Sequence, residues 1–336
     1  MKKVLKVLLV ALMLMTVCAC SGGQTEPEEP GEKQRYVGIC WLDTQIEFYN
    51  WAANTIKDAA EKAGWKAEIS CFDFDVNKQI EQLENFATMG VTDIISIAVD
   101  ADAIVDVCKR LREQGINLNF FAMAPNDIDA YDSVTVADQY EIGVAMAENA
   151  VDWVNEKYPD AADGSIPAVM ISLPTDPDNM LRDDGVRDTL AKCPKIKLVK
   201  EYELDGQESV KVQEAVDTMM LEYPETQLVV CHFASFAIAA DERLLTYPEL
   251  DRENFGIFSG DIDTMIGERM LKTLTGEGLI RATGTYDPDG VYKQFDVCAG
   301  KYDDKLNDKK QYVYEITKFN LDDIKEYMRQ NGYTVD

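Results

Sequence analysis

The chain has 336 residues and is strongly acidic, with 61 Asp and Glu residues against 33 Lys and Arg and a formal net charge of −28. A surface this negative repels nucleic acid and anionic lipid headgroups, so neither is expected as a ligand. The length exceeds the roughly 250 to 300 residues at which a single hydrophobic core usually divides, which favours two lobes.

The N-terminal segment predicts export. Lysines near the start precede an apolar run over residues 7–17, which is too short to cross a bilayer as a helix. Ala19 stands directly before Cys20, and this arrangement resembles a bacterial lipoprotein signal peptide. We therefore expect removal of residues 1–19 and a lipid on Cys20. A plain signal peptide or a buried hydrophobic helix is the alternative interpretation.

Residues 20–35 are expected to form a disordered tether. Residues 21–35 contain no aliphatic or aromatic side chain, so they cannot bury enough apolar surface to offset the entropy of ordering. A coil of that length has a reach on the order of 20 Å. The lipid would therefore hold a soluble body beside the membrane, because no later run of the sequence approaches membrane-spanning length.

The cysteines beyond Cys20 lack the close spacing of a zinc or redox site. Cys40, Cys71 and Cys231 lie within apolar runs that predict strands, where a buried thiol behaves as a small hydrophobic side chain. We therefore expect structural thiols, and neither a metal nor another cofactor. A disulfide between Cys40 and Cys71, in neighbouring strands, is the alternative, because export permits such bonds.

From Tyr36 the chain alternates short apolar runs with longer amphipathic stretches. Residues 93–99 are almost entirely apolar, as in a parallel strand that is covered on both faces. Successive strand and helix units of this kind predict a doubly wound parallel sheet with right-handed crossovers. The strands are expected at residues 36–41, 67–72, 93–99 and 117–123, and the helices at 47–63, 77–89 and 101–114.

The same alternation then starts again, so the sequence predicts an α/β protein with two consecutive sheets of similar size. The second set of strands is expected at residues 133–137, 168–173, 198–203, 228–233, 255–259 and 280–285, and the helices at 142–158, 182–192, 209–223, 236–245 and 263–274. A tail, residues 311–318 followed by a helix over 321–331, remains to pack back on these sheets.

Open α/β sheets bind ligands outside the carboxyl ends of their strands. At those ends this sequence supplies aromatic rings, carboxylates and amides, a mixture that stacks on the C–H faces of sugars and hydrogen-bonds their hydroxyl groups. The candidate ligand-binding residues there are Trp41, Asp43, Asp100, Met123, Asn179, Gln207, His232, Ser235, Asp261, Asp263 and Tyr286. Trp41 could equally pack in the core, and His232 could be a hydrogen-bonded core imidazole. Asp261 and Asp263 could instead serve in turns or helix caps.

Short motifs along the chain carry a family resemblance. They are Phe48-Tyr49, Lys-Gln-Ile-Glu-Gln at 78–82, Gly-Val-Thr-Asp-Ile-Ile-Ser-Ile at 90–97, Asp-Ala-Asp-Ala at 100–103, Arg-Asp-Asp-Gly at 182–185 and Ile-Thr-Lys-Phe-Asn at 316–320. Their order resembles that of type I periplasmic solute-binding proteins, in particular the ribose- and galactose-binding branch. The resemblance covers residues 36–335.

The resemblance implies two doubly wound parallel-sheet lobes joined by a hinge of three crossovers and closing over a ligand. The crossovers are expected near residues 136–139, 285–288 and 312–316. On this reading the N-terminal lobe comprises residues 36–137 and 288–313, and the C-terminal lobe residues 138–287 and 314–336.

The resemblance also implies roles for individual residues. Phe48 and Tyr49 match the aromatic pair that packs on the sugar ring, and Arg182 partly matches the arginine region of the second lobe. Asp138 lies in the first crossover and joins the candidate ligand-binding residues. Core packing of the two rings, and a surface or capping role for Arg182, are the alternatives.

The expected pocket departs from the family pattern at several positions. Ala122-Met123 stands where the family has Asp-Arg, Ala234-Ser235 where it has Asn-Asp, and Tyr286 where it has Gln. The sequence thus matches the family's scaffold but not its ligand-binding residues. Nucleosides, furanosyl compounds and modified sugars therefore remain candidate ligands beside ordinary saccharides.

These features predict a substrate-binding lipoprotein of an ABC importer rather than an enzyme. It would act outside the cytoplasm as a lipid-anchored monomer. Its partners would be a small polar solute, expected to be a saccharide or polyol, and a separate membrane permease. No G-x-S-x-G elbow accompanies His232, and no phosphate-binding loop is present. The alternatives are a sensory binding protein that feeds a receptor or kinase, and a secreted glycosidase. A lac-repressor-like regulator would need a DNA-binding headpiece at the end that carries the lipid signal.

Overall fold

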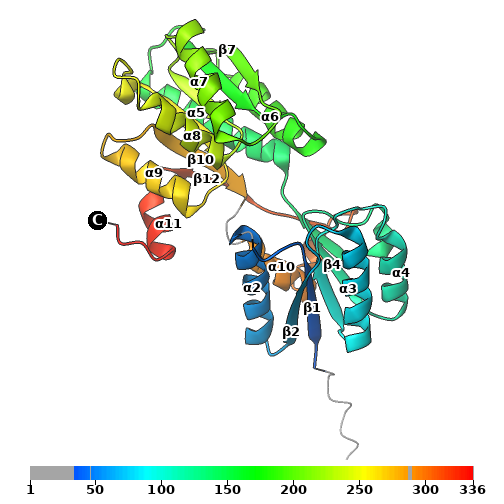
Figure 1. The fold of residues 1–336 in the computed structure, drawn as a ribbon. Coiled ribbons are helices and arrows are strands. Elements are labelled where there is room, and N and C mark those ends of the chain that lie inside the picture. The colour runs from blue at the N-terminus through cyan, green and yellow to red at the C-terminus, as the bar shows by residue number, and fades with distance from the viewer. Residues whose placement is uncertain (1–33, 46, 287–289, 336) are drawn as a thin grey trace, which may run out of the picture. The chain divides into compact units, whose positions relative to one another are not determined.

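The computed structural model describes residues 34–45, 47–286 and 290–335, which Figure 1 follows in chain order from blue to red. The expected signal peptide, Cys20 and most of the expected tether lie outside the described residues. The described chain contains two six-stranded sheets flanked by helices. The predicted α/β class with two doubly wound sheets is therefore confirmed. Among the described helices, none combines the length and apolar character needed to cross a bilayer.

Sheet A has the strand order β11-β5-β4-β3-β1-β2, and all its neighbouring strands are parallel. Helix α2 packs beside α10 and helix α3 beside α4, so each pair covers one face of the sheet. The strands are β1 (Tyr36–Trp41), β2 (Lys66–Cys71), β3 (Asp93–Ser96), β4 (Asn117–Phe121), β5 (Ser133–Val136) and β11 (Gln311–Val313), and the helices α2 (Glu47–Lys62), α3 (Val76–Met89), α4 (Val105–Glu113) and α10 (Gly290–Cys298).

The packing of β1 against α3 follows from local sequence. All six residues of β1 are buried, as expected for a strand covered on both faces. A Cβ atom at Gly38 would lie 2.6 Å from the ring of Phe86 in α3, so glycine permits the close approach. Helix α3 begins where the Asp75 carboxylate accepts two backbone amide hydrogens, and it ends at Gly90 with a φ of 78°. Both are favourable capping arrangements.

Sheet B has the strand order β12-β10-β9-β8-β6-β7, with β12 antiparallel to β10 and the other neighbours parallel. Helices α5 and α6 pack together, as do α7 and α8. The strands are β6 (Ile166–Ser172), β7 (Ile196–Glu203), β8 (Leu228–Cys231), β9 (Gly256–Gly260), β10 (Ile280–Tyr286) and β12 (Ile316–Asn320), and the helices α5 (Gln139–Lys157), α6 (Pro177–Leu190), α7 (Ser209–Glu222), α8 (Ala234–Leu244), α9 (Thr264–Leu274) and α11 (Ile324–Gln330).

Helices α5 and α6 touch backbone to backbone. A Cβ atom at Gly143 would lie 2.0 Å from the carbonyl oxygen of Arg182, and one at Gly185 would lie 2.2 Å from that of Tyr140. Any larger residue at either position would therefore separate the helices. This contact fixes the place of Arg182 on α6 relative to the start of α5.

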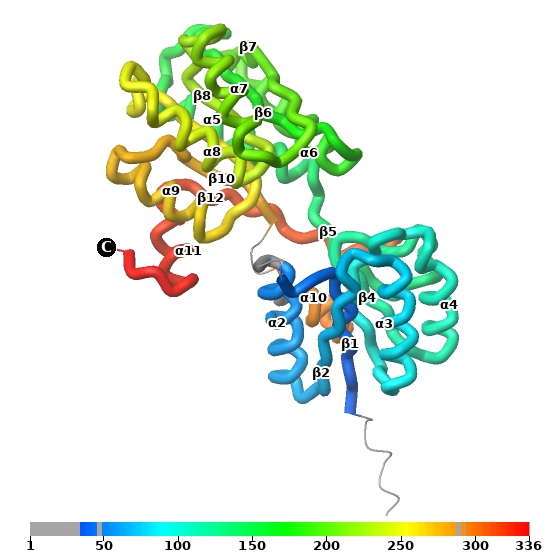
Figure 2. Tube along the Cα trace, viewed as in Figure 1, coloured from blue at the N-terminus to red at the C-terminus, as the bar shows by residue number. Residues whose placement is uncertain are grey.

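The chain crosses from one sheet to the other three times, and its path can be followed along the tube in Figure 2. It does so after β5, after β10 and between β11 and β12. The backbone N–H of Tyr314 donates to the carbonyl oxygen of Val136 at 2.9 Å, and the ring of Tyr314 stacks on Tyr286 with centroids 5.4 Å apart. Three segments distant in sequence thus lie side by side. The three-crossover connection is confirmed, whereas the residue boundaries assigned to the lobes stay a prediction.

Several expected element boundaries were wrong. The helix expected from residue 101 begins at Val105, because Asp100 accepts amide hydrogens from residues 102 and 103 and forms a turn first. The helix expected from residue 182 begins five residues earlier at Pro177, because Asp176 caps its N-terminus and proline suits its first turn. Helix α10 was not anticipated.

The alternative disulfide between Cys40 and Cys71 does not form, and the six described cysteines are free. In the β1–β2 register Cys40 pairs with Ser70, while Cys71 pairs with Trp41. Paired residues of neighbouring strands share a face and successive residues alternate, so the two thiols point to opposite faces of the sheet. Burial raises the pKa of Cys108 to about 12 and also raises the pKa of Cys40 and Cys231, which keeps these sulfur atoms protonated.

Candidate functional site

A polar cluster centred on Arg182 lies at the carboxyl edge of sheet B. The Arg182 side chain is nearly buried, at 6% exposed. Its Nε and Nη2 atoms donate to Oε1 of Gln139 at 3.0 and 2.8 Å. Its Nη1 atom donates to the carbonyl oxygen of His232 at 3.1 Å and lies 3.3 Å from Oδ1 of Asp261. One guanidinium therefore ties together the start of α5, the end of β8 and the turn after β9.

The backbone after β9 is shaped to admit this guanidinium. A Cβ atom at Gly260 would lie 2.7 Å from the carbonyl oxygen of His232 and 2.8 Å from Nη1 of Arg182. The next residue, Asp261, has a φ of 65°, a left-handed conformation that is uncommon outside glycine. Such a backbone arrangement is often associated with function. Here it turns the Asp261 carboxylate toward Arg182 while leaving the side chain 35% exposed.

His232 lies beneath this cluster and is fully buried. Its Nδ1 atom is 2.6 Å from Oδ1 of Asp183, and its Nε2 atom is 3.1 Å from Oδ1 of Asn179. The other carboxylate oxygen of Asp183 accepts from the backbone N–H of Leu173 at 3.3 Å. His232 is thus a hydrogen-bonded core imidazole, the alternative considered for it, and a direct role in ligand binding stays a prediction.

Aromatic rings border the cluster. The guanidinium carbon of Arg182 lies 5.2 Å from the centroid of the Phe233 ring, within the range of a cation–π contact. Tyr286 at the end of β10 stacks on Tyr314 at an interplanar angle of 23°. Burial raises the pKa of Tyr286 to about 12, so its hydroxyl stays protonated and can donate a hydrogen bond.

The carboxyl edge of sheet A carries a second group of aromatic residues. Trp41 is fully buried, its Nε1 atom donates to the carbonyl oxygen of Tyr49 at 2.9 Å, and its ring centroid is 5.8 Å from that of Phe121. Tyr49 is half-buried and lies edge-on to Phe74, whose side chain is 48% exposed. The side chain of Phe48 lies outside the described part of the chain.

The remaining candidates are dispersed over loops and helix ends. Asp138 caps the N-terminus of α5, and Asp263 caps that of α9 by accepting from the backbone N–H of Ile266 at 2.9 Å. Asp263 thus fills the capping role considered as its alternative. The others lie in exposed or half-exposed loop and first-turn positions, and their contact with a ligand stays a prediction: Asp43, Asp100, Met123, Gln207 and Ser235. The structure brings together Asn179, Arg182, His232 and Asp261.

A model of the periplasmic binding protein domain matches residues 37–291, most of the chain. The chain belongs to the periplasmic binding protein family. A curated relative, the multiple sugar-binding periplasmic receptor ChvE of Rhizobium radiobacter, is 25% identical over 104 residues, which cover 31% of this chain and 29% of the relative. The chain thus matches under a third of that relative's length.

Solved structures share the fold of this periplasmic binding protein. A periplasmic ribose ABC transporter protein of Conexibacter woesei superposes with a TM-score of 0.68 at 16% identity, covering 88% of this chain and 95% of that one. The Caulobacter myo-inositol binding protein, bound to myo-inositol, gives a TM-score of 0.61 at 21% identity, covering 89% and 97%. The expected resemblance to type I periplasmic binding proteins is confirmed.

Sequence reasoning missed four residues that build the cluster of this binding protein. Gln139 accepts hydrogen bonds from the guanidinium of Arg182, and the ring of Phe233 lies beside that guanidinium. Asp183 contacts the His232 ring, and Asp176 accepts a hydrogen bond from Asn179. Asp183 stood within the quoted Arg-Asp-Asp-Gly motif, and Phe233 directly follows a candidate. The only sequence signal for Gln139 was its position at the end of the first expected crossover. Its partner, Arg182, lies 43 residues away in sequence, so no local pattern links the two.

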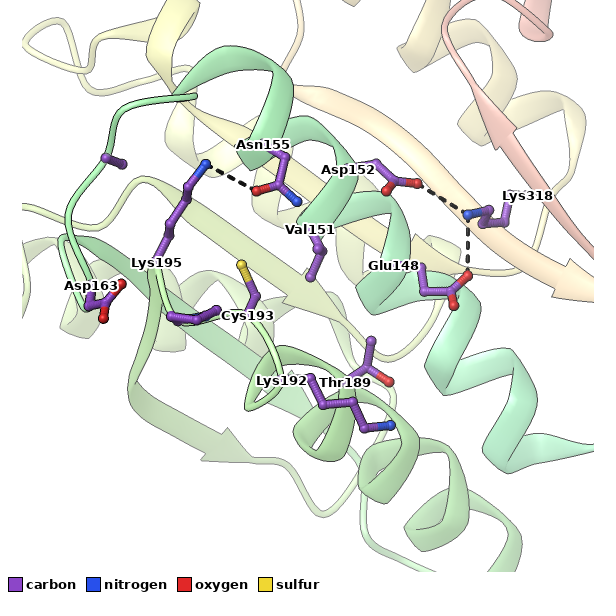
Figure 3. A pocket seen from close by; sticks show the side chains of 12 residues that line it. Glu148, Val151, Asp152, Asn155, Asp163, Thr189, Lys192, Cys193, Lys195 and Lys318 are labelled. Atoms are coloured by element: carbon purple, nitrogen blue, oxygen red, sulfur yellow. Dashed lines mark hydrogen bonds and ion pairs between the residues drawn. The ribbon is translucent and has the colours of Figure 1, made fainter.

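A hollow of about 530 Å³ in this binding protein lies at the other edge of sheet B (Figure 3). Cys193 and Lys195 line it directly before β7, so it lies at the amino ends of the strands. Lys318 forms ion pairs of 3.2 Å with both Glu148 and Asp152 there. Because doubly wound sheets bind ligands at their carboxyl edges, the Arg182 cluster is the stronger candidate for the ligand site.

Proposed function

We propose that this protein is the extracytoplasmic solute-binding lipoprotein of an ABC importer and that it captures a saccharide or a related polyol. The observation that carries the proposal is the Arg182–Asp261 pair at the carboxyl edge of sheet B, with the Phe233 ring beside it. The pair combines a partly exposed carboxylate with a guanidinium that orients it. Carboxylates held in this way accept hydrogen bonds from sugar hydroxyl groups.

The aromatic residues of sheet A would contribute the other half of the contact. Tyr49 and the exposed ring of Phe74 stand at the carboxyl edge of that sheet, where an apolar face can cover sugar C–H groups. A ligand that contacts both sheets would stabilise the closed arrangement of the two lobes through the three crossovers. Met123, Asp43 and Asp100 would line this side in our proposal.

The comparisons support this choice of ligand class. The curated relative is named as a receptor for several sugars, and the two solved structures are named for ribose transport and for myo-inositol binding. Ribose is a pentose and myo-inositol a cyclic polyol, so the shared chemistry is a small ring that carries several hydroxyl groups. We propose the same chemistry for this chain, with a permease in the membrane as its partner.

Binding rather than catalysis fits the carboxylates of the cluster. A glycosidase needs one carboxylic acid and one carboxylate facing the scissile bond. Here the Asp183 carboxylate is fully buried against His232, and the Asp261 carboxylate pairs with Arg182. Both carboxylates are thus already engaged by side chains of the protein, which favours a transport role over the secreted glycosidase.

The lipid anchor and tether complete the proposal. A lipid on Cys20 and a polar segment up to residue 35 would keep the protein next to its permease while leaving it in water. We propose a monomer, because the ligand would be held within one chain. The sensory alternative uses the same binding step and differs only in the partner that reads the closed form.

Calorimetry against a panel of furanoses, pyranoses, inositols and nucleosides tests the proposal. We expect at least one saccharide or polyol to bind and to raise the melting temperature as occupancy increases. An Asp261→Asn variant serves as the site control and should bind the same compound more weakly. Mass spectrometry of a co-purifying ligand that is neither saccharide nor polyol, together with no binding across those classes, would overturn it.

A further inference from the structure

The Arg182 guanidinium fixes the orientation of a neighbouring amide. Its Nε and Nη2 atoms both donate to Oε1 of Gln139, at 3.0 and 2.8 Å. A guanidinium has N–H donors and no acceptor, so only the oxygen of the Gln139 amide can face it. Reversal of the amide would set its N–H groups against those of Arg182. The amide nitrogen, Nε2, therefore lies on the side of the amide that is turned away from the guanidinium.

The backbone beneath this side chain is also held in place. Gln139 is the first residue of α5, and the Asp138 carboxylate caps that end of the helix by accepting from the backbone N–H of Glu141 at 3.2 Å. Helix α5 in turn packs backbone to backbone on α6, which carries Arg182. The Gln139 side chain is thus fixed at its base by the helix and at its tip by the guanidinium. A group held in this way loses little conformational entropy when it binds a ligand.

The nitrogen of the Gln139 amide has donors to spare. No acceptor among the described residues lies within hydrogen-bond distance of its Nε2 atom, and the residue is only half-buried. Asn179, the other amide of the cluster, instead donates through Nδ2 to Oδ2 of Asp176 at 2.7 Å and to Oγ1 of Thr175 at 3.1 Å. Gln139 is therefore the amide of the cluster that can offer N–H groups to a molecule from solution.

We propose that Gln139 is a ligand-binding residue and that its Nε2 atom donates to an oxygen atom of the solute. Asp261 lies on Nη1 of the same guanidinium and is a partly exposed acceptor. One buried arginine would thus orient both a donor and an acceptor for the ligand. The inference rests on the proposed function, because it adds a contact to that site.

The pairing of this donor with this acceptor favours a neutral, hydroxyl-bearing solute. A hydroxyl group can donate to the Asp261 carboxylate, and a hydroxyl oxygen can accept from Gln139, so a ring with several hydroxyl groups can use both. A carboxylate or phosphate group could also accept from Gln139, but it would bring a negative charge close to Asp261, which is unfavourable. Gln139 and Asp261 together would therefore select sugars and polyols over their acidic derivatives.

Gln139→Glu separates donation to the ligand from support of Arg182. Glutamate has nearly the same shape and can still accept from the guanidinium, but it has no N–H to offer. Calorimetry with D-ribose, D-arabinose and myo-inositol, followed by the rest of the panel above, identifies a probe that the wild type binds. The melting temperature of the unliganded variant should match or exceed that of the wild type. Its affinity for the probe should fall about tenfold, because the probe oxygen would then face a second acceptor.

Tyr140→Phe is the matched control in the same turn of α5. It removes an exposed hydrogen bond to Asp188 and should bind the probe as the wild type does. Undiminished binding by Gln139→Glu would show that Gln139 only supports Arg182, which would overturn the inference and leave the proposed function intact. Failure of the wild type to bind any compound of the panel would overturn both.

Nuclear magnetic resonance of the full chain with ¹⁵N-labelled glutamine supplies a second, independent readout. The side-chain NH₂ signals of Gln139 are those that disappear from the spectrum of Gln139→Glu. Saturation with the same probe should shift one of these two proton signals and slow its exchange with water, because that hydrogen would then be donated to the probe. A residue that only supports Arg182 through its oxygen would not respond in this way. NH₂ signals that stay unchanged at saturation would overturn the inference.

Discussion

Arg182 and Asp261 stand 79 residues apart in sequence, on α6 and in the turn after β9, and their side chains meet at 3.3 Å. The guanidinium is buried and is held by other acceptors, whereas the carboxylate is partly open to solvent. The pair therefore consists of a fixed cation and an anion with spare acceptor capacity. Arg182 therefore orients the Asp261 carboxylate, and Asp261 is the residue expected to contact the ligand.

Asp261→Asn should reduce ligand affinity by about tenfold or more, because a hydrogen bond to a charged group contributes roughly 1.5 to 3 kcal/mol. Asparagine tolerates the left-handed backbone at this position, so the melting temperature should change little. Calorimetry and thermal unfolding measure the two effects separately. A variant that binds as wild type does would remove Asp261 from the site.

Gly260→Ala should destabilise the protein by about 2 kcal/mol, because its Cβ atom would collide with the carbonyl oxygen of His232 and with Arg182. Ser259→Ala is the neighbouring control, since its buried hydroxyl has no hydrogen-bond partner within the described structure and its loss should be nearly neutral. Denaturant unfolding of both variants provides the comparison. Equal stability of the two would show that the backbone there is looser than its contacts indicate.

Trp41→Ala and Tyr49→Ala should separate core packing from ligand stacking. Trp41 is fully buried against Phe121, so its truncation should lower the free energy of unfolding by about 3 to 5 kcal/mol. Tyr49 is half-buried, and its loss should weaken binding roughly 30-fold, about 2 kcal/mol, with a smaller effect on stability. Thermal unfolding and calorimetry on both variants check this. If Tyr49→Ala binds within about twofold of wild type, the stacking assignment is wrong.

Ligand should make the protein more compact in small-angle X-ray scattering, since we propose that it contacts both lobes and holds them closed. The change should saturate with the same ligand concentration that saturates calorimetric binding. The Asp261→Asn variant provides the matched control. At a ligand concentration below the dissociation constant of this variant for the ligand, its scattering should stay that of the unliganded protein. Full binding without any change in the radius of gyration would indicate a site confined to one lobe.

Cys20→Ala should release the protein from the membrane fraction, because the lipid on this residue is the proposed attachment. Replacement of Ser21 by Ala beside it leaves the lipid-bearing cysteine in place and should leave the protein on the membrane. Fractionation followed by immunodetection measures both variants. Tight membrane association of Cys20→Ala would contradict the lipoprotein interpretation.

The repeating pattern of strands and helices was predictable because each unit carries its own periodicity and stop signals. β1 is buried throughout, and α3 is bounded by the Asp75 cap and by Gly90, all of which are visible locally in sequence. The start of α6 was missed by five residues because the Asp176-Pro177 signal precedes its first apolar positions. Local rules thus located the elements and misplaced some of their ends.

The candidate site was less predictable, because its contacts join distant parts of the sequence. Arg182, His232 and Asp261 were expected near strand ends, and they do meet there. Their engagement by Gln139 and Asp183 depends on how α5 and α6 pack, which no local pattern specifies. Asp138 and Asp263 show the opposite case, since both stand at helix N-termini where a cap is the commonest role for aspartate.

The protonated, inaccessible sulfur atoms of Cys40, Cys108 and Cys231 give the protein a practical advantage as a reporter. Alkylating dyes react with thiolates, so these positions should stay unlabelled in the native state. Cys71, which is partly exposed, is the residue to replace first. A single cysteine introduced at the exposed position Met123 would then carry a fluorophore beside the proposed site, turning solute capture into a change of emission that can be followed in real time.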